Sequence, residues 1–357
     1  MAIGPITNAK IHPAIGIARV GGSLTEYFIG PETPVPGPVP PGGYRDATGK
    51  LKRQAARFRI YGYDDQGNVV SEIDASMAQI TWTVHVANKK GSWYDFDMAL
   101  DIPEAATIQS ARRNTFVPKE SRGQLSIDPG PRSIMGVKQG PIPFDSGSFF
   151  GKQVYLGELR TDDAGRLIFL GGYGDAGSPI AGFTLTTFDN NAGWYDDTSD
   201  GPVHATVVLN GQTIPVDPAW VVTGPPDYAP NVMPVQSMYD LVFNTLKGQF
   251  VTAPSTPSFC NDILPIFRQL ATTAWVNRGF HMLFGWKSPY DFLAPETLAR
   301  LSSTDAEFLP LRQQIFSFFR IPSSTFFQPF AWPPIYGDAF ITVTNGVPSA
   351  RNALALN

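Results

Sequence analysis

The sequence contains few of the residues on which most catalytic and metal-binding motifs depend. Its 357 residues include one cysteine, Cys260, and four histidines, and no two histidines have the spacing of a zinc site within one element. A single cysteine excludes an internal disulfide bond. The sequence also lacks a phosphate-binding P-loop and the G-x-S-x-G of serine hydrolases, and we expect no dinucleotide-binding G-x-G-x-x-G after a strand. These absences argue against the commonest NTPase, hydrolase and zinc-enzyme classes.

Charge and long apolar runs are also scarce. Charged residues make up 16% of the chain and the formal net charge is -4, which is too mild to indicate nucleic acid or an anionic membrane as a partner. No run approaches the roughly 18 apolar residues of a membrane span. Residues 1–5 show neither the basic nor the apolar region of a signal peptide, so we expect a cytoplasmic protein, with unconventional secretion left open.

The first two thirds of the chain alternate apolar and polar residues with the period of a β-strand. In residues 80–86, isoleucine, tryptophan and two valines alternate with threonine and histidine, and residues 203–209 repeat the pattern. Shorter candidates are residues 57–63, 154–159 and 167–170, which turn sequences separate. Residues 1–230 are therefore predicted to form a mainly β domain, an antiparallel β-sandwich or distorted barrel.

After residue 230 the apolar spacing becomes helical. Ser237 is predicted to cap a helix with Asp240 in a capping box, and Ser258 to cap a second helix that Pro265 interrupts. Thr304 is predicted to cap a third. Residues 231–357 are thus predicted to be a helix-rich segment, which makes the whole chain α+β. An aromatic-rich stretch in this segment predicts a surface that needs a partner; its members are Phe316, Phe318, Phe319, Phe326, Phe327, Phe330 and Trp332.

Several blocks together resemble a known family. Residues 11–21 read Ile-His-Pro-Ala-Ile-Gly-Ile-Ala-Arg-Val-Gly, a block that no general strand or helix rule produces, and residues 194–203 read Trp-Tyr-Asp-Asp-Thr-Ser-Asp-Gly-Pro-Val. Further blocks follow in the same order, at residues 26–32, 52–62, 84–94 and 156–167. The chain resembles the N-terminal part of the lysine ε-oxidase and glycine oxidase-like family of quinoprotein amino-acid oxidases.

The resemblance implies a reaction and a cofactor. Whole members, of the L-lysine 6-oxidase type, deaminate an L-amino acid with dioxygen and release ammonia and hydrogen peroxide. Their cofactor is cysteine tryptophylquinone, a tryptophan oxidised to a quinone and joined through a thioether to a cysteine. A flavoprotein that matures this cofactor is implied as a partner, and an amino acid as the small-molecule substrate.

The cofactor residues of the family are not recognisable in this sequence. The segment around Cys260 departs from the family's cofactor motif, and residues 341–357 fit the catalytic half poorly. We therefore expect a truncated, non-catalytic front half that contains no catalytic residue and no quinone of its own. The sequence leaves open which amino acid is oxidised and whether the chain forms a homo-oligomer.

One block points to a site. The resemblance places residues 194–201 near the substrate entrance, so Trp194 and Tyr195 are predicted to line the substrate pocket. Residues 196–201 also begin like a calcium loop, but Val207 stands where an EF-hand requires glutamate, which excludes that motif. A looser cation site remains as one alternative. The other is a turn in which aspartate and serine side chains bond to local backbone amides, which is the simpler account.

The remaining polar candidates have structural interpretations. His85 and His204 lie on polar strand faces, where hydrogen bonding or solvation is expected, and His12 precedes a proline at the entry of the chain. No metal site is expected from them.

The one dense basic run and the cysteine are interpreted in the same way. Arg57 and Arg59 are expected on one strand face, paired with acids such as Asp64 or Glu72 rather than binding phosphate. Cys260 is expected to be a small buried hydrophobe, with a cross-link to Trp275 or another tryptophan as the alternative.

Two functions from different classes follow. The first is an amino-acid oxidase family protein that supplies the scaffold and part of the pocket wall. The second is a non-catalytic β-sandwich binding or assembly module that kept the family's surface without its chemistry.

Overall fold

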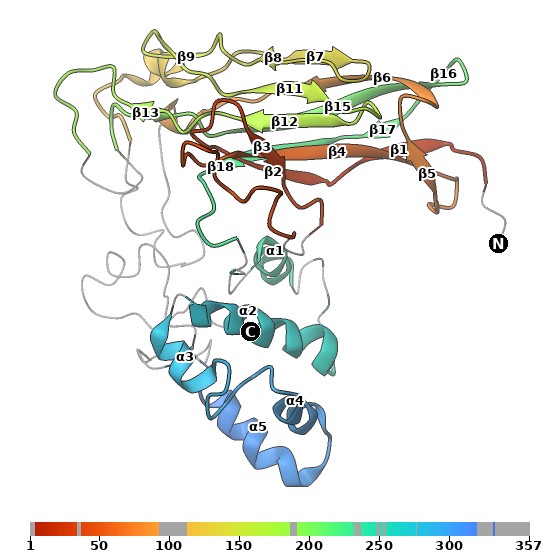
Figure 1. Ribbon diagram of the computed structural model, residues 1–357, viewed down its shortest axis with the longest axis vertical. Coiled ribbons are helices and arrows are strands. Elements are labelled where there is room, and N and C mark those ends of the chain that lie inside the picture. Colours follow the sequence, from red (N-terminus) through yellow and green to blue (C-terminus); the bar gives the residue numbers. More distant parts are fainter. Residues whose placement is uncertain are drawn as a thin grey trace. The chain divides into compact units, whose positions relative to one another are not determined.

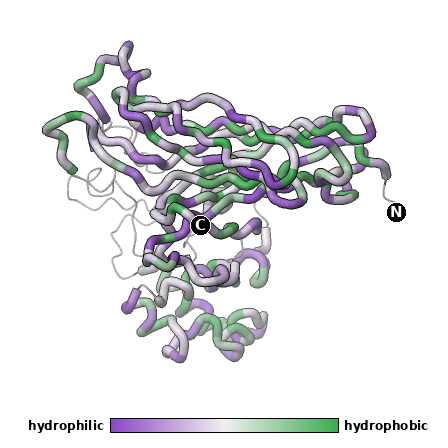
Figure 2. Tube along the Cα trace, turned by 45° about the horizontal axis from the view of Figure 1, so that its top comes forward, coloured by the Kyte–Doolittle hydropathy of each residue, from purple (hydrophilic) through white to green (hydrophobic). Residues whose placement is uncertain are grey.

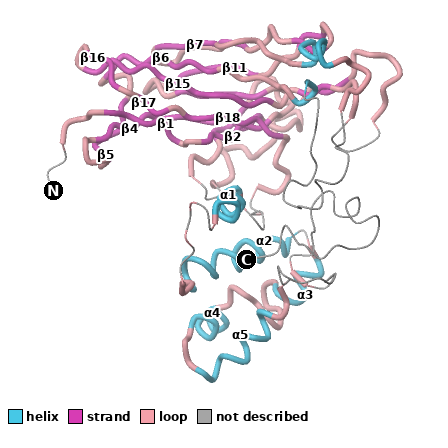
Figure 3. Tube along the Cα trace, turned by 180° about the vertical axis from the view of Figure 1, so that it is seen from behind, coloured by secondary structure: helices cyan, strands magenta, loops and turns pink. Residues whose placement is uncertain are grey.

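The computed structural model describes residues 4–33, 37–92, 113–185, 191–230, 232, 237–247, 250, 252, 255–275, 277–319 and 331–332. The chain divides into two compact units, the first consisting of Met1–Phe96 and Arg112–Tyr228 and the second of Asp97–Ala111 and Ala229–Asn357. The first is built from strands and the second from helices (Figures 1 and 3). The predicted domain bounds, 1–230 and 231–357, stay a prediction.

The strands of the first unit are joined by connections that range from short turns to long segments, such as the one from Val84 to Arg132. They are β1 (Asn8–His12), β2 (Ile15–Arg19), β3 (Tyr27–Ile29), β4 (Arg53–Tyr63), β5 (Val69–Ile73), β6 (Ala78–Val84), β7 (Arg132–Met135), β8 (Ile142–Pro143), β9 (Ser148–Phe149), β10 (Lys152–Gln153), β11 (Gly157–Thr161), β12 (Leu167–Gly171), β13 (Ala176–Gly177), β14 (Tyr195–Asp196), β15 (Ser199–Leu209), β16 (Gln212–Ile214), β17 (Val216–Asp217) and β18 (Ala219–Gly224). Two short 3₁₀ helices accompany them, η1 (Lys90–Ser92) and η3 (Lys119–Leu125).

Within the described residues, 14 strands join one sheet, whose main path is β7-β6-β15-β18-β2-β4-β12-β11-β8. The two ends of this path come together, because Arg132 of β7 donates from Nε to the carbonyl oxygen of Pro143 in β8 over 3.1 Å. Most pairs are antiparallel, whereas β2–β18, β3–β4 and β1–β17 are parallel. The predicted class, a mainly β domain followed by helices, is confirmed, and the parallel pairs are what the sequence pattern did not indicate.

The alternation predicted from the sequence identifies the residues that form the apolar core. Ile80, Trp82 and Val84 of β6 are buried, as are Val203 and Val207 of β15, which pairs with β6 along its length. Hydrophobic and hydrophilic stretches alternate along the strands in Figure 2. Burying one face of each strand favours a sheet that curls round a single apolar interior.

Strand β2 reverses the usual arrangement of large and small residues. Its inward positions are Gly16 and Ala18, and its outward positions are Ile15 and Ile17, which are 53% and 41% exposed. A Cβ at Gly16 would lie 2.3 Å from Cζ of Phe58, a fully buried ring on β4. Glycine is required at this position because the ring occupies the space of a side chain.

The polar face of β4 carries the ion pairs expected of the basic run. Glu32 accepts hydrogen bonds from both Arg57 and Arg59, and Arg59 also pairs with Glu72 at 3.1 Å. The expected partner Glu72 is thus confirmed. The prediction that Asp64 pairs with these arginines was wrong, because its carboxylate accepts the backbone amides of its own turn, including that of Asn68 at 2.8 Å.

The second unit is a small helical cluster. Its elements are α1 (Met238–Leu246), a π-helical turn η4 (Phe259–Ile263), α2 (Leu264–Thr272), η5 (Thr273–Trp275), α3 (Arg278–Phe284), α4 (Pro295–Ser302), η6 (Ala306–Phe308) and α5 (Leu309–Phe316). Its core is rich in phenylalanine; the buried members are Phe267, Leu270, Phe280, Phe284, Phe292, Leu301 and Ile315. Trp332 contacts the rings of Phe280 and Phe284 edge to face.

The predicted helix starts are partly confirmed. Ser237 and Asp240 form a capping box on α1, and the Ser258 side chain caps η4. Thr304 was wrong as a cap, because Asp305 precedes η6 and the α5 helix begins only at Leu309. Pro310 sets that start, since it fits only the first turn of a helix.

Part of the aromatic-rich stretch can be placed. Phe318 and Phe319 pack against the phenylalanine core of the second unit, whereas Phe316 is 68% exposed. Phe326, Phe327 and Phe330 lie outside the described residues. Of the helices that the structure describes, none has the length and apolar character needed to span a bilayer.

We predict that Gly16→Val destabilises the first unit by about 3 kcal/mol, because the new side chain overlaps the Phe58 ring. The matched control is Ile17→Val on the outward face of the same strand, which is expected to change stability by less than about 0.5 kcal/mol. Urea unfolding of the three proteins measures the difference. A G16V transition at the wild-type midpoint would contradict the packing of β2 on Phe58.

Candidate functional site

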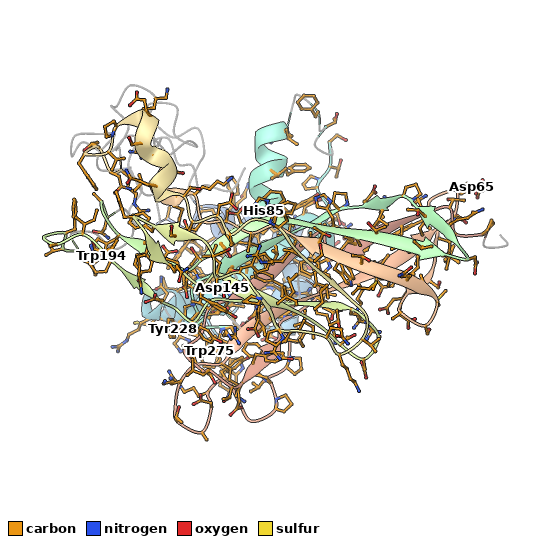
Figure 4. The ribbon with its side chains drawn as sticks, turned by 90° about the horizontal axis from the view of Figure 1, so that it is seen from above. Asp65, His85, Asp145, Trp194, Tyr228 and Trp275 are labelled. Atoms are coloured by element: carbon orange, nitrogen blue, oxygen red, sulfur yellow. The ribbon has the colours of Figure 1, made fainter. Side chains whose placement is uncertain are left out.

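The residues predicted to line a pocket lie around β14, on the approach to β15. In Figure 4, Trp194 lies at the opposite end of the strand-rich unit from Asp65, which is in the turn between β4 and β5. β14 pairs with β13 in a short antiparallel bridge, in which Gly177 faces Tyr195. The candidate site is therefore built from the β12–β13 loop, β14 and the segments that contact them.

Tyr195 is held in place by its hydroxyl and its ring. The side chain is 8% exposed, and the hydroxyl donates to Oδ2 of Asp175 over 3.1 Å. Burial and the Asp175 carboxylate raise the pKa of Tyr195 to about 12, so the phenol is a neutral donor at physiological pH. The ring packs 6.0 Å from that of Phe149.

Trp194 contributes a backbone acceptor and an unpaired indole. Its carbonyl oxygen accepts from Nη2 of Arg113 over 2.9 Å, while Nε1 is buried without a partner within the part of the chain that the structure describes. Trp194 and Tyr195 both line a cavity of about 10 Å³. That volume holds about one water molecule rather than an amino acid. Their role in a substrate pocket stays a prediction.

Two buried polar residues that sequence reasoning missed, Asn114 and Arg122, fix this region through hydrogen bonds. Asn114 is fully buried with a positive φ of 57°; its Nδ2 donates to the Gly91 carbonyl and its Oδ1 accepts the Gly193 amide over 2.6 Å. Buried Arg122 donates to the carbonyl oxygens of Gly91, Ser92, Arg113 and Asn114. No local sequence signal identifies the bonds to Gly91, Ser92 and Gly193, because they join segments distant in the chain.

Asp196 forms the turn that was the simpler account of the calcium-like block. Its Oδ1 accepts the backbone amide of Thr198 at 3.0 Å and the Thr198 hydroxyl at 2.6 Å, and Lys90 pairs with Oδ2. Burial alone would raise the pKa of Asp196, but Lys90 and Thr198 hold it below its ordinary value. Among the residues described, no three histidine, cysteine, aspartate or glutamate side chains are arranged to hold a metal ion.

Asp197, the next residue, has the opposite environment. It is 2% exposed, and its Oδ2 accepts the backbone amides of Gly174 at 2.8 Å and Asp175 at 2.9 Å. Burial raises the pKa of Asp197 to about 6; the two amide donors oppose that rise, and the Asp196 and Asp175 carboxylates add to it. A buried carboxyl with a perturbed pKa is more typical of functional than of structural positions.

The loop that donates these amides carries a glycine pattern that sequence reasoning missed. Residues 172–177 read Gly-Tyr-Gly-Asp-Ala-Gly, a G-x-G-x-x-G directly after β12. A dinucleotide site would need a helix at this point, but the loop leads into β13. Its amides bind the Asp197 carboxylate instead, and Gly172 leaves room for it, since a Cβ there would lie 2.2 Å from Oδ2.

A second buried charged cluster lies between β4 and β11. Arg53 and Glu158 are both almost fully buried, with Nη2 of Arg53 3.5 Å from Oε1 of Glu158. Burial favours a raised pKa for Glu158, but hydrogen bonds from Tyr155 and Arg160 keep it lowered. Because every charge here has an opposite partner, the cluster is a structural cross-link within the sheet.

The histidines are placed as follows. Nε2 of His12 lies 2.9 Å from the Tyr63 hydroxyl, and Nε2 of His85 lies 2.6 Å from Oδ1 of Asp128. His204 and His281 are exposed. The expected hydrogen bonding of His85 is confirmed, although the residue lies just beyond the end of β6, and the expected solvation of His204 on β15 is confirmed.

The expected burial of Cys260 was wrong, because the side chain is exposed. The π-helical turn η4 directs its neighbours Phe259 and Ile263 toward the phenylalanine core of the second unit and leaves the intervening cysteine in solvent. Helical periodicity of 3.6 residues did not predict this, because a π-turn rotates each residue by a smaller angle.

The fold of the chain matches that of an amino-acid-oxidising enzyme of known structure. Crystal structures of L-Lys ε-oxidase from Marinomonas mediterranea, one described as its Schiff base intermediate with L-Lys, superpose with a TM-score of 0.68 at 26% identity. The match covers 88% of this chain and 50% of the oxidase. In sequence, L-lysine 6-oxidase of the same organism is 30% identical over 321 residues, covering 75% of this chain and 43% of the relative.

Residues 12–223 match the family described as L-Lysine epsilon oxidase N-terminal. The chain belongs to this family, as the blocks in its sequence indicated. It spans about half the length of the relatives that it matches.

The raised pKa of Asp197 predicts an unusual dependence of stability on pH. Between the ordinary aspartate value of 3.8 and about 6, the native state binds more protons at this group than the unfolded state. Its contribution to stability is therefore greatest below that window and is lost as the pH rises through it. Because Asp197→Asn cannot ionise, we predict that the free energy of unfolding of D197N minus that of wild type rises by up to about 3 kcal/mol from pH 4 to pH 7.5.

Urea unfolding at a series of pH values measures this difference. The control is Asp196→Asn, because the lowered pKa of Asp196 predicts a change of opposite sign that is confined to below about pH 4. A D197N difference that stays constant from pH 4 to pH 7.5 would show that Asp197 ionises normally.

Proposed function

We propose that this chain provides the front part of a quinoprotein L-amino-acid oxidase, its strand-rich scaffold and one wall of the substrate pocket. The observation that carries the proposal is the match to the N-terminal region of the L-lysine ε-oxidase family over residues 12–223. The site supports it as well. Tyr195 and Trp194 lie in a segment whose backbone and hydroxyl are fixed by Arg113, Asn114 and Asp175, as a preorganised pocket wall requires.

The reaction proposed for the whole oxidase is oxidative deamination of an L-amino acid by dioxygen and water, giving an aldehyde or oxo acid, ammonia and hydrogen peroxide. The relatives act on L-lysine by name, so an L-lysine-like amino acid is the proposed substrate. What the residues of this chain do is confined to the pocket wall. Neutral Tyr195 offers an aromatic surface, and its hydroxyl proton stays on the oxygen because Asp175 accepts the hydrogen bond.

The family's cysteine tryptophylquinone does not fit the residues described. Cofactor chemistry of this kind needs a cysteine next to a tryptophan in a site shielded from solvent. Cys260 is exposed, and Trp275 and Trp286 of the same unit are 86% and 74% exposed. We propose that this chain contributes no residue to the quinone, and no catalytic step is assigned to it here.

The partners proposed with this function are the amino acid and a flavoprotein that matures the cofactor in the whole oxidase. A cytoplasmic location, with unconventional secretion as the alternative, remains the proposal from sequence. Nucleic acid and membranes are not proposed as partners.

A redox-cycling quinone stain and an intact mass test the proposal, on protein expressed with and without a family flavoprotein. We predict no quinone signal and an unmodified mass in both samples, because Cys260 is not placed beside a tryptophan in a shielded site. A flavoprotein-dependent signal accompanied by a mass change, and lost in Cys260→Ser, would contradict the proposal and make Cys260 a cofactor residue.

A second candidate, a non-catalytic binding or assembly module, is favoured by one surface. On adjacent parallel strands β2 and β18, Ile15 lies opposite Trp220 and Ile17 opposite Val222. Ile15, Ile17 and Trp220 are 53%, 41% and 42% exposed. Parallel strands are usually covered on both faces, so this apolar outer face favours an interface.

Sedimentation of wild type and Ile15→Thr/Ile17→Thr at several concentrations tests this candidate in its simplest form, self-association. If the face joins two copies, wild type forms a dimer at concentrations at which the double variant is monomeric. Threonine keeps the β-branched shape, and an unchanged thermal midpoint would show that the fold is intact. A wild type that is monomeric at every concentration argues against assembly through this face.

A further inference from the structure

The starting observation is a carboxyl group enclosed by the backbone of a glycine-rich loop. Asp197 Oδ2 accepts two successive amides, those of Gly174 and Asp175, and the absence of a side chain at Gly172 makes room for it. Successive backbone N–H groups of this kind form a concave anion site. The anion in this protein is an internal side chain, which is 2% exposed.

The enclosed loop is linked to Tyr195 in two ways. Asp175, whose amide binds Asp197, accepts the Tyr195 hydroxyl through its own carboxylate. Two residues further on, β13 pairs with β14, with Ala176 facing Asp196 and Gly177 facing Tyr195. Any loosening of the Gly174–Asp175 backbone therefore reaches both the hydroxyl and the main chain of Tyr195.

We propose that Asp197 is a protonation-dependent anchor, which positions Tyr195 by accepting hydrogen bonds from the backbone amides of Gly174 and Asp175. When Asp197 is ionised, it accepts two charge-assisted hydrogen bonds and the loop is held. When Asp197 is protonated, the same bonds are those of a neutral acceptor and are weaker, so the loop opens more often. This local effect is opposite in sign to the effect on global unfolding, because release of the loop leaves Asp197 buried without its two donors, whereas unfolding exposes it to water. One proton moves between solvent and the carboxyl group, and no covalent bond other than that O–H bond forms or breaks.

The charged groups around Asp197 come from three elements. The β12–β13 loop contributes the Asp175 carboxylate and β14 contributes the Asp196 carboxylate, and both disfavour an ionised Asp197. Tyr195 of β14 is neutral and donates to Asp175. Lys90 of η1 pairs with Asp196. On β15, Ser199 bonds to Thr223 of β18. Asp175 is exposed, whereas Asp197 is buried and has no cationic partner among the described residues, and burial raises its pKa to about 6.

The importance of this anchor for substrate rests on the proposed pocket role of Tyr195, but the anchor itself does not. It is a property of the chain that can be measured without substrate, cofactor or activity. Failure of the oxidase proposal would leave the measurement below unaffected.

Hydrogen–deuterium exchange with mass spectrometry tests the proposal on the whole chain at pH 5 and pH 7.5. The observed quantity is the protection of a peptide containing the Gly174 and Asp175 amides, corrected for the intrinsic pH dependence of exchange. We expect protection about tenfold higher at pH 7.5 than at pH 5, since the bonds to ionised Asp197 are the stronger. A smaller change in the same direction is expected for the Tyr195 amide.

Two variants make the result decisive. Asp197→Asn keeps the shape and a neutral acceptor, so its protection should match that of wild type at pH 5 and show no dependence on pH. Tyr195→Phe removes the hydroxyl bond to Asp175 and should keep the pH step of the Gly174–Asp175 peptide. Equal wild-type protection at the two pH values, or a step that survives in D197N, would overturn the proposal.

Discussion

The arrangement of the strand-rich unit depends on strand β4, because the side chains on both of its faces fix the positions of neighbouring segments. This strand of 11 residues pairs with β1, β2, β3, β5 and β12, so errors in its register would spread to most of the sheet. Inside, Phe58 fills the space that Gly16 leaves, which fixes β2 against β4. Outside, Arg57 and Arg59 engage Glu32 and Glu72, which ties β4 to β5 and to the segment after β3. The packing of Phe58 against Gly16 sets the register of β4, and the ion pairs of Arg57 and Arg59 form only in that register.

The same scaffold brings two neighbouring aspartates into contrasting surroundings. Asp196 faces Lys90 and Thr198 and is stabilised as an anion, whereas Asp197 points into the interior, where only backbone amides meet it. An ionised Asp197 costs the fold stability near neutral pH, and natural proteins tolerate such costs mainly where function needs them. The cost falls next to Tyr195, in the segment that we propose lines the substrate pocket.

The parts that followed from sequence are those governed by local rules. Alternation in β6 and β15, the turn at Asp196 and the Ser237 capping box depend on residues close in the chain, and each is as predicted. Contacts between segments that are distant in the chain could not be predicted from the sequence. The parallel pairing of β2 with β18, the ion pair of Arg57 with Glu32, and the bonds of Asn114 to Gly193 and of Arg122 to Gly91 join distant segments. For the site, the sequence indicated the Trp194–Tyr195 segment through resemblance to the family. The backbone amides that donate hydrogen bonds to Asp197 could be identified only from the structure.

This chain has the family's strand-rich scaffold, and we propose that it carries no oxidase chemistry of its own. The most direct measurement is hydrogen peroxide release, coupled to oxygen consumption, when the purified chain is given L-lysine. We predict no release above that of buffer, because the chain offers no shielded cysteine–tryptophan pair among its described residues. Turnover that depends on L-lysine and disappears in Cys260→Ala would contradict the account.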